Sequence, residues 1–153
     1  MAHILQKESY LAMIRNAEGA NIFRNLYVMI EGKPEDILKD GKRSCAVFVS
    51  SVLCQFKLVS SAHATVAGLE RDLEQSGWRR VDTPQLGDVL VWEPKLQGET
   101  ESSHAGFYLG GDKAISNNWN TRVPEQHHFT YGTNKDGTPA RRLTAIYTHD
   151  FVS

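Results

Sequence analysis

Cysteine is scarce in this chain, with Cys45 and Cys54 as the two examples among 153 residues. Two cysteines are too few for a disulfide framework of the kind that holds small secreted domains together. The 5 prolines and 12 glycines form no linker-like stretch, and the sequence contains no internal repeat or low-complexity tract. We therefore expect one domain, residues 1–153, that is stabilised by an ordinary hydrophobic core.

An excess of charge of one sign is missing as well. Seventeen basic and eighteen acidic side chains leave a net charge of -1. Proteins that bind nucleic acid or anionic lipid over their whole surface are usually basic, so we expect neither nucleic acid nor membrane as a partner. The composition does not indicate an oligomeric state.

Long hydrophobic runs are also absent. No stretch approaches the roughly 20 apolar residues that cross a bilayer. Lys7 and Glu8 interrupt the N-terminal segment, which therefore has no secretory signal pattern. We expect a cytoplasmic protein, unless it is exported by a route that needs no cleaved signal.

Helical patterns dominate the first half of the sequence. The clearest lies over residues 44–56, where Val49, Val52, Leu53 and Phe56 form one apolar stripe. Weaker patterns predict helices over residues 8–17 and 64–75. The periodicity of residues 21–31 is ambiguous between a helix end and a buried strand, and residues 32–42 are predicted to form a loop.

The second half of the sequence is typical of strands. Alternating or continuous apolar residues predict strands at residues 78–81, 89–92, 104–109, 113–117 and 143–148. Residues 124–142 are rich in turn-forming types and are predicted to be a mobile loop. Helices followed by strands indicate an α+β fold with an antiparallel sheet.

Cys45 is the strongest candidate for a catalytic residue. Ser44 is a typical N-cap, which places Cys45 at the first helical position. Free backbone N–H groups and the helix dipole favour the thiolate there, so we expect a lowered thiol pKa. His104, at the head of an apolar strand, is its candidate base. The alternative is that Cys45 is a buried structural cysteine.

Cys54 offers an internal comparison. It lies nine positions after Cys45, about 180° around the helix. The two thiols therefore cannot share one site or form a disulfide within this helix. We expect Cys54 to be packed and inert.

Three blocks of this sequence resemble NlpC-like papain-fold cysteine peptidases. They are SCAVFV at residues 44–49, GDVLVW at residues 87–92 and HAGFYLG at residues 104–110. The family has the same order of a helix-capping cysteine, a Gly-Asp strand entry and a histidine strand reading His-x-Gly-x-Tyr-x-Gly. The match covers about half of the chain, residues 43–118. Ser44 differs from the family's usual Asp, and Tyr27 lies further upstream than the family's tyrosine.

The resemblance implies a papain-like (NlpC-type) fold and a catalytic role for each matching residue. Cys45 would be the nucleophile and His104 the general base. A polar residue on the next strand would orient the imidazole, and counting along the hairpin places it at Ser116. An amide oxygen reaches further than a hydroxyl, which favours Asn117 or Asn118. The sequence does not decide between them, and both asparagines can instead cap a turn.

Residues outside these blocks give weaker indications. Trp119 and Arg122 follow the third catalytic position and are candidate substrate-binding residues, by stacking and by pairing with a carboxylate. The alternative for Trp119 is that it covers the edge of the sheet. His127 and His128 are adjacent, so an extended backbone points them to opposite faces, and we expect no metal and no other cofactor. The pairs Arg79-Arg80 and Arg141-Arg142 are expected to be solvated strand residues rather than an anion site.

The resemblance implies a cysteine peptidase or amidase that hydrolyses an amide bond through a Cys45 thioester. Its substrate would be a bacterial peptidoglycan stem peptide, a related cell-wall fragment or another peptide. Two alternatives stay open. One is an acyltransferase or thioesterase that uses the same Cys–His pair, and the other is an inactive binding module.

Overall fold

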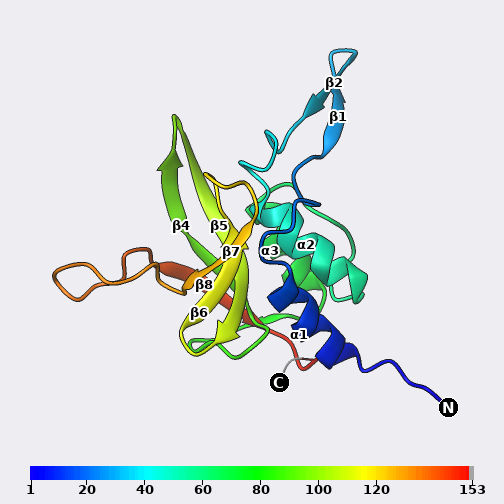
Figure 1. Cartoon of the computed structure of the whole chain (residues 1–153), viewed down its shortest axis with the longest axis vertical. Helices are drawn as coiled ribbons and strands as arrows, with labels where there is room; N and C mark the ends of the chain where they lie inside the picture. The colour runs from blue at the N-terminus through cyan, green and yellow to red at the C-terminus, as the bar shows by residue number, and fades with distance from the viewer. Residues whose placement is uncertain (152–153) are drawn as a thin grey trace.

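Helices pack against one face of an antiparallel sheet in the computed structural model, which describes residues 1–151 (Figure 1). The described helices are α1 (Gln6–Asn16), α2 (Cys45–Gln55) and α3 (Val66–Gln75). The described strands are β1 (Tyr27–Ile30), β2 (Lys33–Asp36), β3 (Arg79–Arg80), β4 (Val89–Gln97), β5 (Thr100–Gly110), β6 (Lys113–Asn117), β7 (Pro124–His128) and β8 (Leu143–Thr148). The chain is therefore α+β, as the sequence predicts.

Six strands form the main sheet, in the order β3-β8-β4-β5-β6-β7. Every described pairing in it is antiparallel. β1 and β2 pair separately as a hairpin that projects from the body of the molecule (Figure 1). Because β4, β5 and β6 are neighbours, the two sequence blocks at residues 87–92 and 104–110 lie side by side at the centre of the sheet.

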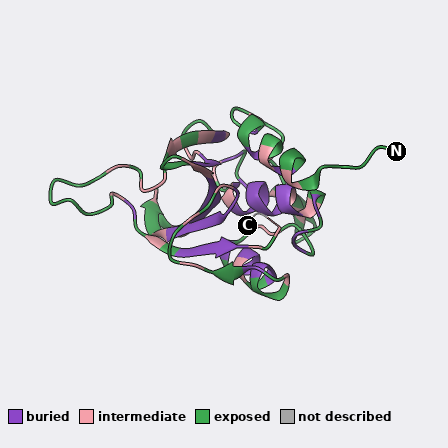
Figure 2. Cartoon of the chain, turned by 90° about the horizontal axis from the view of Figure 1, so that it is seen from below, coloured by how far each residue is buried: buried purple, intermediate pink, exposed green. Residues whose placement is uncertain are grey.

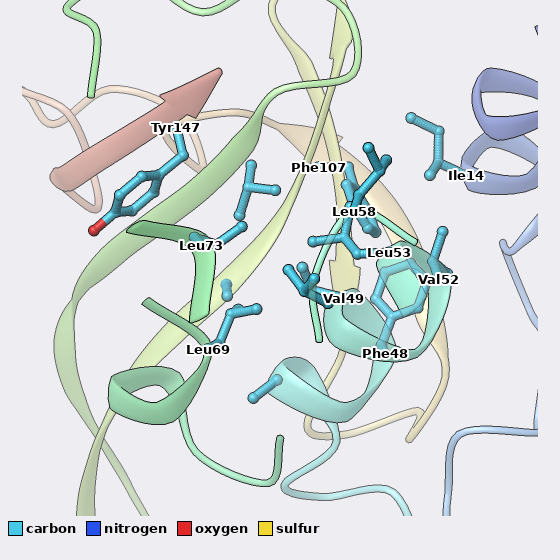
Figure 3. Close-up of a cluster of buried hydrophobic side chains, with 14 of the residues drawn as sticks. Ile14, Phe48, Val49, Val52, Leu53, Leu58, Leu69, Leu73, Phe107 and Tyr147 are labelled. Carbon is cyan, nitrogen blue, oxygen red and sulfur yellow. The ribbon is translucent and has the colours of Figure 1, made fainter. Parts of the chain in front are cut away.

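α2 forms the centre of the core. Its predicted apolar stripe is buried, and Phe48, Val49 and Leu53 have no exposed surface. Figure 3 shows these side chains together with Phe107 of β5, Leu69 and Leu73 of α3, and Ile14 of α1, which belong to the same cluster. Figure 2 shows the same concentration of buried residues where helices and sheet meet. This packing fixes the N-terminal end of α2 against β5.

The sheet is covered on its second face as well. Val89 and Val91 of β4 join the core on the helix side, whereas Leu90 and Trp92 belong to a second buried cluster. Alternation along a strand places these two pairs on opposite faces. A strand buried on both faces reads as a continuous apolar run, which explains the sequence of residues 89–92.

Two loop predictions are wrong. Residues 33–36 form β2, whose backbone pairs with β1 even though its side chains are mostly exposed and polar. Residues 124–128, within the predicted mobile loop, form β7 and pair with β6. Both are edge strands, where backbone pairing needs no apolar pattern in the sequence. The remainder of that loop projects away from the sheet (orange in Figure 1).

Ser44 occupies the N-cap position of α2, but its side chain makes no capping hydrogen bond. Its hydroxyl is buried without a partner among the described residues. α3 is capped as expected for its sequence, since Thr65 accepts a hydrogen bond from the backbone N–H of Gly68. No helix within residues 1–151 is long and apolar enough to cross a membrane.

Gly106 is required by the close approach of β5 to its neighbours. A Cβ added there would lie 2.5 Å from the carbonyl oxygen of Ile115, 2.8 Å from the Cβ of Ser116 and 3.1 Å from the Trp92 ring. We predict that Gly106→Ala lowers the free energy of unfolding by about 2–3 kcal/mol, because the central strands must separate. Urea denaturation measures this, and an unchanged midpoint would contradict the packing described here.

Candidate active site

Cys45 is the first residue of α2 and is half-buried. The first backbone hydrogen bond of the helix runs from the N–H of Phe48 to the carbonyl of Ser44. The N–H groups before Phe48 therefore have no partner within the helix. Those of Cys45 and Ala46 face the sulfur and favour its ionised form, together with the N–H of Ala105 on β5.

The expectation of a lowered thiol pKa at Cys45 is nevertheless wrong. Burial raises the pKa of the Cys45 thiol, and this effect exceeds the opposing effects of the backbone N–H groups and of the Arg141 charge. Removing the thiolate from water costs more free energy than its interactions with the N–H groups and with Arg141 recover. The resting sulfur is therefore a protonated thiol at neutral pH.

His104 lies on β5, opposite Trp92 of β4, and is 5% exposed. Its ring packs 5.3 Å from the Trp92 ring, measured between centroids. Burial lowers the pKa of His104 to about 3, with further lowering by the positive charge of Arg141 and by the neighbouring His127. The imidazole is therefore neutral at pH 7 and has a lone pair with which to accept a proton.

Cys45 and His104 line the same cavity, which has a volume of about 420 Å³. Cys45 lies at the N-terminal end of α2 and His104 on β5, and residues 64–67, around the start of α3, close a further side. Lys42 and Arg43 stand in the lining, which contains no acidic side chain. The sulfur and the imidazole do not hydrogen-bond to each other in this resting structure. The two groups line one cavity that a substrate can occupy.

Ser116, the position counted for the third catalytic residue, is buried on β6 beside Gly106. Its hydroxyl bonds to Nε2 of His127 at 2.7 Å and to the hydroxyl of Tyr131 at 3.0 Å. It therefore contacts a histidine, but that histidine is His127 rather than His104.

The two asparagines behave differently. Nδ2 of Asn117 donates to the carbonyl of Gly41 at 2.7 Å, while its Oδ1 is buried without a partner among the described residues. Oδ1 of Asn118 accepts from the N–H groups of Asn120 and Thr121 and so caps a turn. Asn117 lines the Cys45 cavity together with His104 and keeps a free acceptor. None of Ser116, Asn117 and Asn118 hydrogen-bonds to His104 within residues 1–151.

Trp119 and Arg122 lie at the two ends of the turn that Asn118 caps, and their side chains contact different parts of the molecule. Trp119 lines a second cavity of about 240 Å³, and the ammonium of Lys42 lies 5.7 Å from its ring centre. Arg122 pairs with Asp40 at 3.1 Å and does not contribute to the lining of either cavity described here. The structure therefore brings Trp119 to the site and directs Arg122 toward Asp40.

An aromatic and polar cluster beside His104 was not predicted from the sequence. His127 stacks on Tyr131 with ring centres 3.9 Å apart, and both pack against Trp92. Burial raises the pKa of Tyr131 to about 12, so its phenol is neutral. Tyr131 follows β7 at the start of the projecting segment, where only its aromatic character marks it in the sequence.

The expectation that Arg141 is solvated is wrong. Arg141 is 6% exposed and donates to the backbone carbonyls of Glu93 and Ser102. It lines the 240 Å³ cavity, and its charge lowers the pKa of both Cys45 and His104. It was missed because a single arginine that turns inward from a loop leaves no periodic signal.

Cys54 lies in the last turn of α2, half-buried against the core. Burial raises its thiol pKa, as does the nearby carboxylate of Asp72. Both cysteines are free thiols. Cys54 lines neither the Cys45 cavity nor the second one.

Neither comparison with known proteins assigns the chain to a family. No protein-family model matches it, and no curated protein matches it in sequence.

Proposed function

We propose that this protein is a cysteine amidase or peptidase that cleaves an amide bond through a Cys45 thioester. The observation that carries the proposal is the shared cavity, which is lined by a thiol at a helix N-terminus and by a neutral, buried imidazole. A nucleophile and a base around one substrate-sized space are the elements that covalent amide hydrolysis needs.

The proposed reaction has two halves. The Cys45 thiol passes its proton to His104, and the sulfur attacks the amide carbon. The C–N bond then breaks as His104 returns that proton to the leaving amine, which leaves an acyl group on Cys45. Water next attacks the thioester with His104 again as base, which restores the thiol and releases the acid. The backbone N–H of Cys45 is the proposed donor to the oxyanion.

Neutral resting groups are compatible with this sequence of steps. Burial raises the pKa of Cys45 and lowers that of His104, so proton transfer must create both charges in the cavity. A thiolate and an imidazolium side by side attract each other, and this attraction offsets part of the cost of burying each charge. Cys45 should therefore ionise during the reaction rather than before it.

We further propose a papain-like fold of the NlpC type and a peptidoglycan stem peptide, or a related wall fragment, as substrate. Both rest on the three sequence blocks, two of which occupy adjacent central strands while the third begins α2. The basic residues at the cavity also favour a substrate that carries negative charge.

An amine-release assay on short wall peptides tests the activity. We expect Cys45→Ala to lower the rate about 1,000-fold or more, because the covalent route is lost. Cys54→Ala is the matched control, since Cys54 lies on the same helix but outside the cavity, and its rate should stay within about twofold of the wild type. Equal rates in all three proteins would contradict the proposal.

Adding an acceptor amine separates the two enzyme classes. A hydrolase releases amine without an acceptor, whereas an acyltransferase depends on one for turnover. If Cys45→Ala binds the peptides as the wild type does and neither turns them over, the protein is a binding module.

A further inference from the structure

We propose that Arg141 forms a subsite beside Cys45 that binds a carboxylate group of the substrate. The proposal deepens the amide hydrolysis described above and rests on it, because it names the chemical class of the substrate at the same site. Arg141 follows the projecting segment between β7 and β8, and its guanidinium turns inward to the second cavity.

The hydrogen bonds of Arg141 leave one nitrogen of the guanidinium, Nη1, free. Its Nε and Nη2 donate to the carbonyl of Glu93 at 3.1 and 3.0 Å, and Nη2 also donates to the carbonyl of Ser102 at 3.2 Å. Nη1 bonds to no described residue and is not sealed from solvent. Within residues 1–151 no carboxylate forms an ion pair with Arg141.

Arg141 is held by neutral carbonyls, and the charge of Glu93 acts on it without a direct ion pair, so its charge is only partly compensated. Burying such a charge is costly, and the cost falls when an anion binds it. A guanidinium N–H group forms a charge-assisted hydrogen bond with a carboxylate, and such bonds are stronger than neutral ones. Nη1 of Arg141 is therefore available to donate to a carboxylate that arrives with a ligand.

The layout of the two cavities places this carboxylate away from the bond that is cleaved. Cys45 lines the first cavity and Arg141 lines the second, while Gln97, His104 and Asn117 line both. A ligand whose amide lies at Cys45 can thus extend past His104 to Arg141. This arrangement favours contact with a substituent of the substrate rather than with the oxyanion at the attacked carbon.

The neighbouring hydroxyl groups cannot replace Arg141 as donors. Nδ1 of His127 must donate to the carbonyl of His128, at 2.7 Å, because that oxygen only accepts. The pKa of His127 is lowered by burial, so the ring is neutral and its Nε2 accepts from Ser116. Ser116 in turn accepts from Tyr131. The protons of Ser116 and Tyr131 are therefore committed, and Arg141 keeps the free donors.

Carboxylate binding would also assist the base. The charge of Arg141 lowers the pKa of His104, since two cations repel. An anion on Arg141 would cancel part of this charge and make His104 more basic. Glu125, an acidic residue in the same lining, already accepts from Nδ2 of Asn118. Its presence makes an amine ligand the alternative that the experiment must exclude.

The test compares acetyl-dialanine with its C-terminal amide by NMR titration of Cys45→Ala protein, and dialaninamide, which carries a free amine, is a third probe. We expect the free carboxylate to bind at least about tenfold more tightly than the amide. Arg141→Gln should remove this preference, and Arg141→Lys should keep part of it. Thermal denaturation of each variant verifies folding.

Several results would overturn the subsite. The first is equal binding of acetyl-dialanine and its amide to protein that retains Arg141. The second is a preference for the carboxylate that remains in Arg141→Gln. The third is tighter binding of dialaninamide, whose free amine would pair with Glu125. Binding to Cys45→Ala needs no turnover, so the two proposals fail separately. Turnover without the preference contradicts the subsite, whereas the preference without turnover in the wild type contradicts the hydrolase.

Discussion

His104→Gln is expected to lower kcat for amide hydrolysis about 1,000-fold, within the range usual for loss of a general acid–base group. Glutamine keeps a polar side chain in the cavity but cannot carry the proton from Cys45 to the leaving amine. Steady-state kinetics on a wall peptide measures the loss. KM should change much less than kcat, because the imidazole acts in the transition state.

Two further variants show whether the loss of activity is specific to His104. His128→Gln alters an exposed histidine on β7 and should leave kcat within about twofold of the wild type. The double variant Cys45→Ala/His104→Gln should be no slower than Cys45→Ala, since the two residues act as one unit. Additive losses, or a His104→Gln variant that retains full activity, would show that His104 is not the base.

Acid is expected to destabilise the fold between pH 6.5 and 4, by about 3 kcal/mol from His104. The pKa of buried His104 is lowered to about 3, whereas in the unfolded chain it returns to 6.5. In this window the unfolded state binds a proton that the folded state does not, so stability falls as pH falls. His127, whose pKa is also lowered by burial, contributes with the same sign.

Urea denaturation at pH 6.5 and pH 4 measures this dependence. His104→Gln should lose less stability than the wild type over the same interval, because glutamine does not titrate. Asp72 hydrogen-bonds to His63 and accepts from Ser60 and Ser76, and these bonds lower its pKa. Its contribution is therefore lost mainly below pH 4, outside this interval. Equal losses in the two proteins would contradict a neutral, buried His104.

The fold was predictable where periodicity reflects burial. The apolar stripe of α2 and the continuous apolar run of residues 89–92 both correspond to buried faces in the structure. β2 and β7 were missed because edge strands are held by backbone hydrogen bonds that any sequence can make. The Gly-Asp strand entry and the His-x-Gly strand lie on neighbouring strands, as a compact site requires.

The site was predictable only in part. The sequence places Cys45 at a helix start and His104 on a strand, and the structure brings both to one cavity. The sign of the Cys45 pKa shift was missed, because position on a helix reveals the dipole but not the degree of desolvation. Arg141 and Tyr131 were missed because loop residues reach the site through tertiary contacts that no local pattern encodes.

The most direct test of the central claim is to trap the acyl group on Cys45. Wild-type protein is mixed with an activated peptide ester, quenched in acid and mapped by mass spectrometry. We predict an acyl adduct on Cys45 that hydroxylamine removes, no adduct on Cys54, and a much smaller yield in His104→Gln. Amide hydrolysis with no adduct on Cys45, or equal labelling of Cys45 and Cys54, would contradict a thioester mechanism at this site.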